Sequence, residues 1–162
     1  MTRVPPTLRH YNVPAEVLAD SGEMLRARGK LGLEAVVVWV GTVIDESTAQ
    51  VLVAVRPGQI AYRGDQGCAV EVPPAALSEL IAALPPDVYV LARLHTHPTD
   101  AYHSKVDDTN MLISHDRAIS IVVPYFARDD LQLPSCSVNE LRHGRGWVEL
   151  QPAEVAERFV IV

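Results

Sequence analysis

The chain has 162 residues, of which 48% are hydrophobic and 21% are charged, and its formal net charge is −6. This length and composition predict one globular domain over residues 1–162 and exclude disordered, collagen-like and disulfide-scaffold chains. The surplus of acidic side chains is unfavourable for nucleic-acid binding, which requires a basic surface to contact phosphates, so no nucleic-acid partner is expected.

Helical spacing of apolar residues and frequent prolines predict short, well-delimited elements. Helices are expected over residues 14–28, 74–84 and 104–114, with a last turn or two over 153–158. Strands are expected over residues 33–43, 49–55, 88–94, 118–123, 137–142 and 147–151, with a hairpin across 45–47 and a loop over 62–67. This order predicts an α/β fold in which helices flank a mixed, partly antiparallel sheet.

The sequence also predicts the compartment of the protein. It contains no run of about 18 apolar residues that could span a membrane, and its first residues lack the apolar core of a signal peptide. We therefore expect a cytoplasmic protein without a membrane partner. Cys68 and Cys136 are expected to be reduced, because disulfides are rare in a reducing compartment.

The strand over residues 88–94 leads into His95-Thr96-His97-Pro98. Because residues i and i+2 of a strand point to the same face, the two imidazoles project together. The proline cannot donate to a sheet ladder and ends the strand, so both histidines lie at its open end. Two imidazoles and a carboxylate, from Asp107 or Asp108 on the next element, form the ligand set of a catalytic zinc ion.

A second polar residue stands in an unusual place. Glu34 belongs to an apolar stretch over residues 33–39, where a carboxylate is costly unless it has a partner. The alternative is that Glu34 occupies the exposed first position of a strand.

Taken together, Glu34, His95-Thr96-His97-Pro98 and Ser104-x-x-Asp107 resemble the JAMM motif of the JAB/MPN zinc metalloproteases. That pattern is a distant Glu, then H-[ST]-H-P, then S-x-x-D, and Gly41 fills the glycine position seven residues after the Glu. The resemblance covers roughly residues 12–125 and is specific, because three separated parts agree in order. It implies the JAB/MPN fold, which is cytidine-deaminase-like, with a mixed, mostly antiparallel sheet flanked by helices.

The resemblance also implies a role for each residue of the motif. His95, His97 and Asp107 would bind one zinc ion. Glu34 would act as the general base and then pass the proton to the leaving amine. Ser104 would hydrogen-bond the developing oxyanion.

The family further implies a substrate class. Many JAB/MPN members are isopeptidases that remove ubiquitin or ubiquitin-like proteins from lysine side chains. This short chain resembles bacterial stand-alone members that accompany ubiquitin-like conjugation enzymes. The implied partners are therefore a ubiquitin-like protein or its conjugates, and E1/E2-like enzymes of the same system.

The sequence departs from the family pattern at two places. Val37 stands where the family often has glycine, and the gap from the second histidine to the aspartate is one residue shorter than the commonest spacing. The commonest gap selects Asp108, whereas S-x-x-D selects Asp107. We prefer Asp107, because Ser104 and Asp107 then belong to one helical unit. No second Cys/His cluster follows, so no structural zinc is expected.

Three other functions stay open at this stage. The first is a non-catalytic scaffold or binding module of the same fold, and the second is the trimming of a sulfur-carrier protein or a small peptide. The third is a non-haem iron oxygenase with two histidines and one carboxylate, although the usual all-β barrel of that class conflicts with the expected helices. Outside the motif, Trp147 is interpreted as a packing residue and His103 as a loop residue that is either solvated or in contact with substrate.

Overall fold

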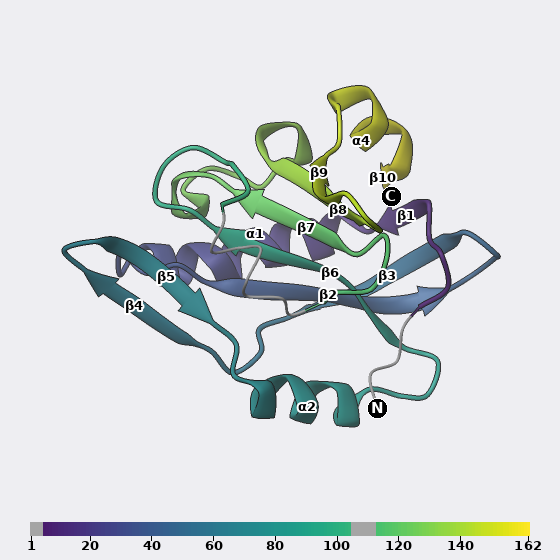
Figure 1. Cartoon of the computed structure of the whole chain (residues 1–162), viewed down its shortest axis with the longest axis horizontal. Coiled ribbons are helices and arrows are strands. Elements are labelled where there is room, and N and C mark those ends of the chain that lie inside the picture. The colour runs from purple at the N-terminus through teal and green to yellow at the C-terminus, as the bar shows by residue number, and fades with distance from the viewer. Residues whose placement is uncertain (1–4, 105–112) are drawn as a thin grey trace.

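The most apolar segments of the chain form the middle of one large sheet. The computed structural model describes residues 5–104 and 113–162, in which eight strands pair in the order β10-β1-β3-β2-β6-β7-β8-β9 (Figure 1). They are β1 (His10–Val13), β2 (Val36–Val43), β3 (Thr48–Val55), β6 (Tyr89–Thr96), β7 (Ile119–Val123), β8 (Ser137–Arg142), β9 (Gly146–Glu149) and β10 (Phe159–Ile161). The central strands β2, β6 and β7 are buried along most of their length, as expected for β-branched runs covered on both faces.

The sheet is mixed. Its pairs are antiparallel from β3 through β2 to β6 and from β7 through β8 to β9. They are parallel where β1 meets β3 and β10 and where β6 meets β7. The expected α/β class, a mixed sheet flanked by helices, is confirmed.

Three helices are described: α1 (Ala15–Gly29), α2 (Pro74–Ala83) and α4 (Pro152–Arg158). All three fall where the apolar spacing and the prolines predict them. The fourth expected helix, over residues 104–114, falls largely outside the described residues. None of the described helices is long and apolar enough to cross a membrane.

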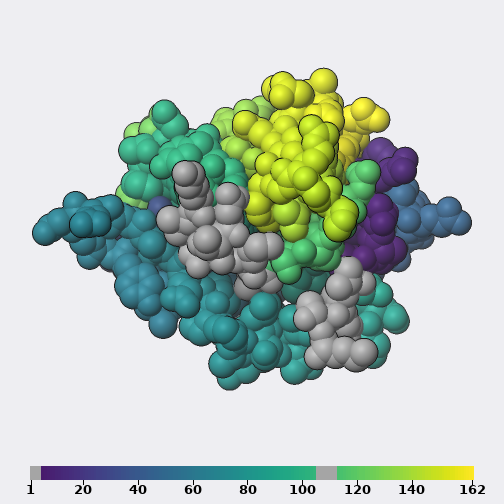
Figure 2. Space-filling model, in the orientation of Figure 1, coloured from purple at the N-terminus to yellow at the C-terminus, as the bar shows by residue number. Residues whose placement is uncertain are grey.

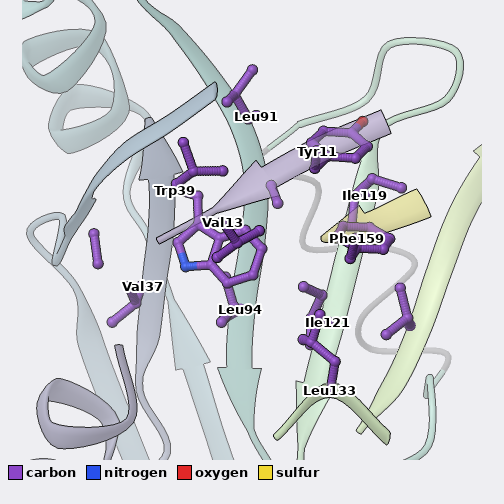
Figure 3. Close-up of a cluster of buried hydrophobic side chains, with 14 of the residues drawn as sticks. Tyr11, Val13, Val37, Trp39, Leu91, Leu94, Ile119, Ile121, Leu133 and Phe159 are labelled. Atoms are coloured by element: carbon purple, nitrogen blue, oxygen red, sulfur yellow. The ribbon is translucent and has the colours of Figure 1, made fainter. Parts of the chain in front are cut away.

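Alternate residues of β2 point into two separate apolar clusters. Val37 and Trp39 face the larger cluster, into which α1 inserts Val17 and Leu25 (Figure 3). The intervening valines of β2 face a smaller cluster, against which Leu80 of α2 packs. The sheet therefore lies between α1 and α2, and residues that share a face with Val36 or Val38 lie on the α2 side.

The turn between β2 and β3 is closed by the side chain of Asp45. Its carboxylate accepts hydrogen bonds from the backbone N–H groups of Ser47 (2.9 Å) and Thr48 (2.8 Å). The bond from Ser47 is the main cause that lowers the pKa of the Asp45 carboxyl below its ordinary value. The predicted hairpin across residues 45–47 is confirmed, and it forms one end of the longest axis of the molecule (Figure 1).

At the opposite end of the molecule, a sequence-based expectation is wrong. Residues 62–67 are not a loop but part of a two-stranded hairpin of β4 (Ile60–Gly64) and β5 (Gly67–Glu71), which projects from the body of the molecule (Figure 2). Gly67, with φ of 111°, supplies the turn conformation that other residues rarely adopt. The segment resembles a loop in sequence because a glycine on each side flanks the polar pair of the turn and because strands of five residues are too short to show alternation.

Two short strands at one side of the sheet are also absent from the sequence-based expectations. β1 and β10 have four and three residues and come from opposite ends of the chain. They pair in parallel, and the rings of Tyr11 and Phe159 stack with centroids 4.9 Å apart. Such short segments become strands only when the tertiary fold supplies a partner. Both cysteines are free, as expected.

Candidate metal centre

The antiparallel pairing of β2 with β6 brings separate parts of the motif to one end of the sheet. Val36 lies opposite His95 in this register. Extending the register by two residues places Glu34 opposite His97, on the same face as His95. This is the α2 side of the sheet, because Val36 belongs to the smaller apolar cluster.

Backbone and side-chain hydrogen bonds hold the strand end next to Glu34. The N–H of Thr96 donates to the carbonyl of Ala35 (3.1 Å), and the N–H of Ala35 donates to the Thr96 hydroxyl (3.0 Å). On the next residue, the Gln59 side chain accepts from the N–H of Val36 (2.8 Å) and donates to its carbonyl (2.9 Å). Gln59 thus takes the place of a strand beside β2. Sequence reasoning did not identify this role of Gln59, or that of Thr96.

The three motif residues on this strand pair are buried. Glu34 is 7% exposed, and the histidine pair, His95 and His97, is 4% and 5% exposed. The alternative of an exposed Glu34 at the start of a strand is therefore wrong. A carboxylate and two imidazoles in such surroundings are costly to desolvate unless they interact with one another, with a cation or with substrate.

The geometry of the histidine pair fits a shared metal ion. The two Nε2 atoms lie 3.3 Å apart, and the rings meet at an interplanar angle of 63°. Two nitrogens bound at about 2.05 Å to one tetrahedral zinc ion lie about 3.3 Å apart. Without a metal, the same separation allows one neutral imidazole to donate to the other. The donor set therefore suits zinc, which takes imidazole nitrogen readily.

The backbone of His97 is held on both sides. Its N–H donates to the carbonyl of Val123 (2.9 Å), and its carbonyl accepts from the N–H of Phe126 (2.9 Å). Phe126 belongs to a left-handed turn, Tyr125–Ala127, whose three residues have φ of 52°, 54° and 55°. Each non-glycine residue in this conformation costs about 1–2 kcal/mol, so the surrounding contacts must offset the strain.

Helix α1 supplies contacts that hold this left-handed turn. The Arg26 side chain donates to the carbonyl of Ala127 (3.0 Å). Gly29 lies so close to the turn that a Cβ at this position would come within 2.4 Å of the Phe126 carbonyl oxygen. No motif in the sequence indicates that α1 supports the metal centre through the left-handed turn.

The residues after His97 form an irregular segment, residues 99–104, which we call the strap. Asp100 accepts a hydrogen bond of 2.6 Å from the Tyr125 hydroxyl, and this bond raises the pKa of that hydroxyl above its ordinary value. The Tyr102 ring lies against the His97 ring with centroids 4.6 Å apart. Ser104, the last residue of the strap, is half-buried.

The third predicted ligand lies outside the described residues. This applies to Asp107 and equally to Asp108, so both stay predictions. Within residues 5–104 and 113–162, no group of three or more His, Cys, Asp or Glu side chains is placed to hold a metal ion. The histidine pair can supply two ligands, and a third must come from elsewhere.

The structure explains two other positions of the motif region. A Cβ on Gly41 would lie 2.0 Å from the carbonyl oxygen of Gln50, so only glycine fits this close approach between β2 and β3. Val37, where the family often has glycine, is fully buried in the larger apolar cluster, where its side chain contributes to packing. The departure at Val37 therefore reflects packing on the face opposite the histidine pair.

Comparisons with known proteins show which family the chain belongs to. No family model matches the chain. The chain is 30% identical over 156 residues to the probable metalloprotease y4jG of Sinorhizobium fredii. The alignment covers 96% of this chain and 95% of that relative. The chain belongs to the JAB/MPN metalloprotease family. The resemblance inferred from the motif is thereby confirmed.

Solved structures also resemble this JAB/MPN protein. The solution structure of a protein from Desulfitobacterium hafniense matches with a TM-score of 0.58 and 17% identity, over 94% of this chain and 92% of that one. This likeness shows a shared fold. A JAB1/MPN domain protein from Archaeoglobus fulgidus aligns with a TM-score of 0.49 and 13% identity, over 92% of this chain and 98% of that one.

Proposed function

We propose that this JAB/MPN protein is a zinc-dependent isopeptidase or peptidase that cleaves the amide bond after the C-terminal tail of a ubiquitin-like protein. The reaction would serve deconjugation or precursor maturation. The observation that carries the proposal is the approach of the two histidine Nε2 atoms to 3.3 Å on the face that also carries the buried Glu34. Similarity to a probable metalloprotease supports peptidase chemistry. The ubiquitin-like substrate follows from the family resemblance.

The metal would be held by the histidine pair through Nε2 and by Asp107. When bound, zinc lowers the pKa of water and polarises the substrate carbonyl. The hydrogen bonds of the His97 backbone to Val123 and Phe126 keep this ligand in place before the metal arrives.

The remaining chemistry belongs to two side chains of the protein. Glu34 accepts a proton from the attacking water and delivers it to the leaving amine, which its burial beside the histidine pair favours by limiting exchange with solvent. Ser104 donates a hydrogen bond to the oxyanion that develops on the carbonyl oxygen. Removing one such donor from a hydrolase costs about 10²–10³ in kcat.

The projecting hairpin offers a place for an extended tail. Arg63 on β4 donates to the carbonyl of Leu31 (3.2 Å), three residues before Glu34. Among the described residues, β4 and β5 pair only with each other. A substrate tail could therefore add to this hairpin as a further strand and reach the metal centre.

Elemental analysis of the purified full chain beside His97→Ala is the first test. We expect about one zinc ion per wild-type chain and loss of zinc in the variant. Iron instead of zinc would favour oxygenase chemistry. No bound metal after zinc addition would favour the alternative of a non-catalytic scaffold.

The substrate class is tested with ubiquitin-like proteins that carry a fluorogenic amide at the C-terminus, together with a sulfur-carrier protein and short peptides. We expect the wild-type chain to cleave the ubiquitin-like substrates and His97→Ala to be inactive. Cleavage of only the sulfur carrier or the peptides would keep the peptidase chemistry and replace the proposed substrate. No cleavage by a zinc-loaded chain would contradict the enzymatic proposal.

A further inference from the structure

An aromatic contact connects the strap to a distant part of the chain. The ring of His103, next to Ser104, lies against the ring of Trp147 with centroids 5.0 Å apart and an interplanar angle of 35°. Trp147 belongs to β9, at the far edge of the sheet in the pairing order. Two consecutive residues of the strap therefore pack on different parts of the chain, Tyr102 on His97, directly after β6, and His103 on β9.

Arg93, a residue of the central strand β6, contacts the ring of Trp147. The guanidinium carbon of Arg93 lies 5.4 Å from the centre of the indole, and Arg93 is 4% exposed. The Nε of Arg93 donates to the hydroxyl of Ser120 (3.1 Å), which is fully buried. Arg93 precedes His95 by two residues and shares its face of β6. The indole therefore contacts the strand that leads into the histidine pair.

The indole ring, rather than its N–H group, makes these contacts. Trp147 also packs against the smaller apolar cluster. Its N–H is buried and has no hydrogen-bond partner among the residues that the structure describes. A buried donor without a partner is unfavourable, so phenylalanine should keep the ring contact and remove this cost.

We propose that Trp147 is a positioning residue, whose ring holds His103 and thereby keeps the neighbouring Ser104 in place. The inference deepens the proposed function and rests on it, because it assumes that Ser104 acts on the substrate. Trp147 does not touch the reacting atoms in this proposal. It acts through the strap, which the ring contact keeps ordered before substrate binds.

The test uses the full chain, with and without zinc, in the variants W147A and W147F. The matched control is V148A, which truncates the adjacent, half-buried residue of β9 that points to the opposite face. Hydrogen exchange of the backbone amides of residues 99–104 should be about tenfold faster in W147A than in wild type. W147F and V148A should exchange at the wild-type rate.

Kinetics supply the second measurement. In W147A we expect kcat to fall about tenfold or more while KM and the zinc content stay unchanged, because a misplaced oxyanion donor weakens only the transition state. W147F should restore kcat. If W147A does not fold, H103A removes the same contact from the other side, and H103F keeps the ring as its control.

Two results overturn the proposal. One is that the backbone amides of residues 99–104 exchange hydrogen at the wild-type rate in W147A or, if that variant does not fold, in H103A. The other is an increase in V148A as large as that in W147A, because the effect would then be general destabilisation of β9. If the wild-type chain has no peptidase activity, the proposed function fails, whereas the exchange rates still decide whether Trp147 holds the strap.

Discussion

The two halves of the metal centre are held by different kinds of contact. Glu34 and the histidine pair lie at the paired ends of β2 and β6, where backbone hydrogen bonds and burial hold them. The contacts of the strap include two ring contacts and a side-chain hydrogen bond, as well as the backbone bond from Tyr125 to Thr99. A backbone ladder survives most single substitutions, whereas a ring contact is lost with one side chain. A change of one side chain should therefore disturb the placement of the strap more than the placement of the two strand ends.

The largest expected effect concerns the third ligand of the metal centre, which the motif assigns to Asp107. Asp107→Ala should lose the bound zinc and with it the activity, by about a thousandfold or more, whereas Asp108→Ala should keep both. Metal content and hydrolysis, measured on both variants side by side, check this. The reverse pattern would move the third ligand to Asp108 and the family's commonest spacing would then hold.

The next effect concerns Glu34 and separates its role as general base from the role of the metal ligands. Glu34→Gln should retain zinc and lose about 10²–10⁴ in kcat, because the amide keeps the shape of the side chain but cannot accept the proton. Steady-state kinetics with zinc-loaded protein provide the measurement, and Glu23→Gln on the exposed surface of α1 is the matched control. Unchanged turnover would remove Glu34 from the mechanism.

A third substitution should disturb both halves at once. Gly29→Ala places a Cβ within 2.4 Å of the Phe126 carbonyl oxygen, so the left-handed turn must shift. That turn bonds the carbonyl of His97 and, through Tyr125, the carbonyl of Thr99. We expect a loss of about 1–3 kcal/mol in the free energy of unfolding and weaker zinc binding. Gly64→Ala, with open space around its Cβ, serves as the control in urea titrations. An equal loss in both variants would contradict the proposed contact.

The smallest effect concerns the hydrogen bond at the start of the strap. Tyr125→Phe removes the bond to Asp100 and should lower Tm slightly near pH 7. The bond raises the pKa of the Tyr125 hydroxyl, so its contribution is full below the unfolded pKa of about 10 and is lost as pH rises through the folded value. The difference in Tm between wild type and variant should therefore vanish at high pH. A difference that persists there would have another cause.

The local pattern of the chain predicted much of this arrangement. Apolar spacing located α1 and α2, and β-branched runs located β2, β6 and β7, because these elements bury enough surface to follow their own periodicity. Short elements were missed where the periodicity was too brief to show. The β4–β5 hairpin was expected to be a loop. β1 became a strand by pairing with β3 and β10, and β10 by pairing with β1.

The sequence by itself determined the family and the chemistry of the histidine pair, since the H-x-H spacing puts two imidazoles on one face of any strand. Only the tertiary structure decided what surrounds that pair. The Gln59 bridge, the left-handed turn and the contact of His103 with Trp147 join residues far apart in the chain. No local pattern encodes such contacts, because they depend on which elements the common core brings together.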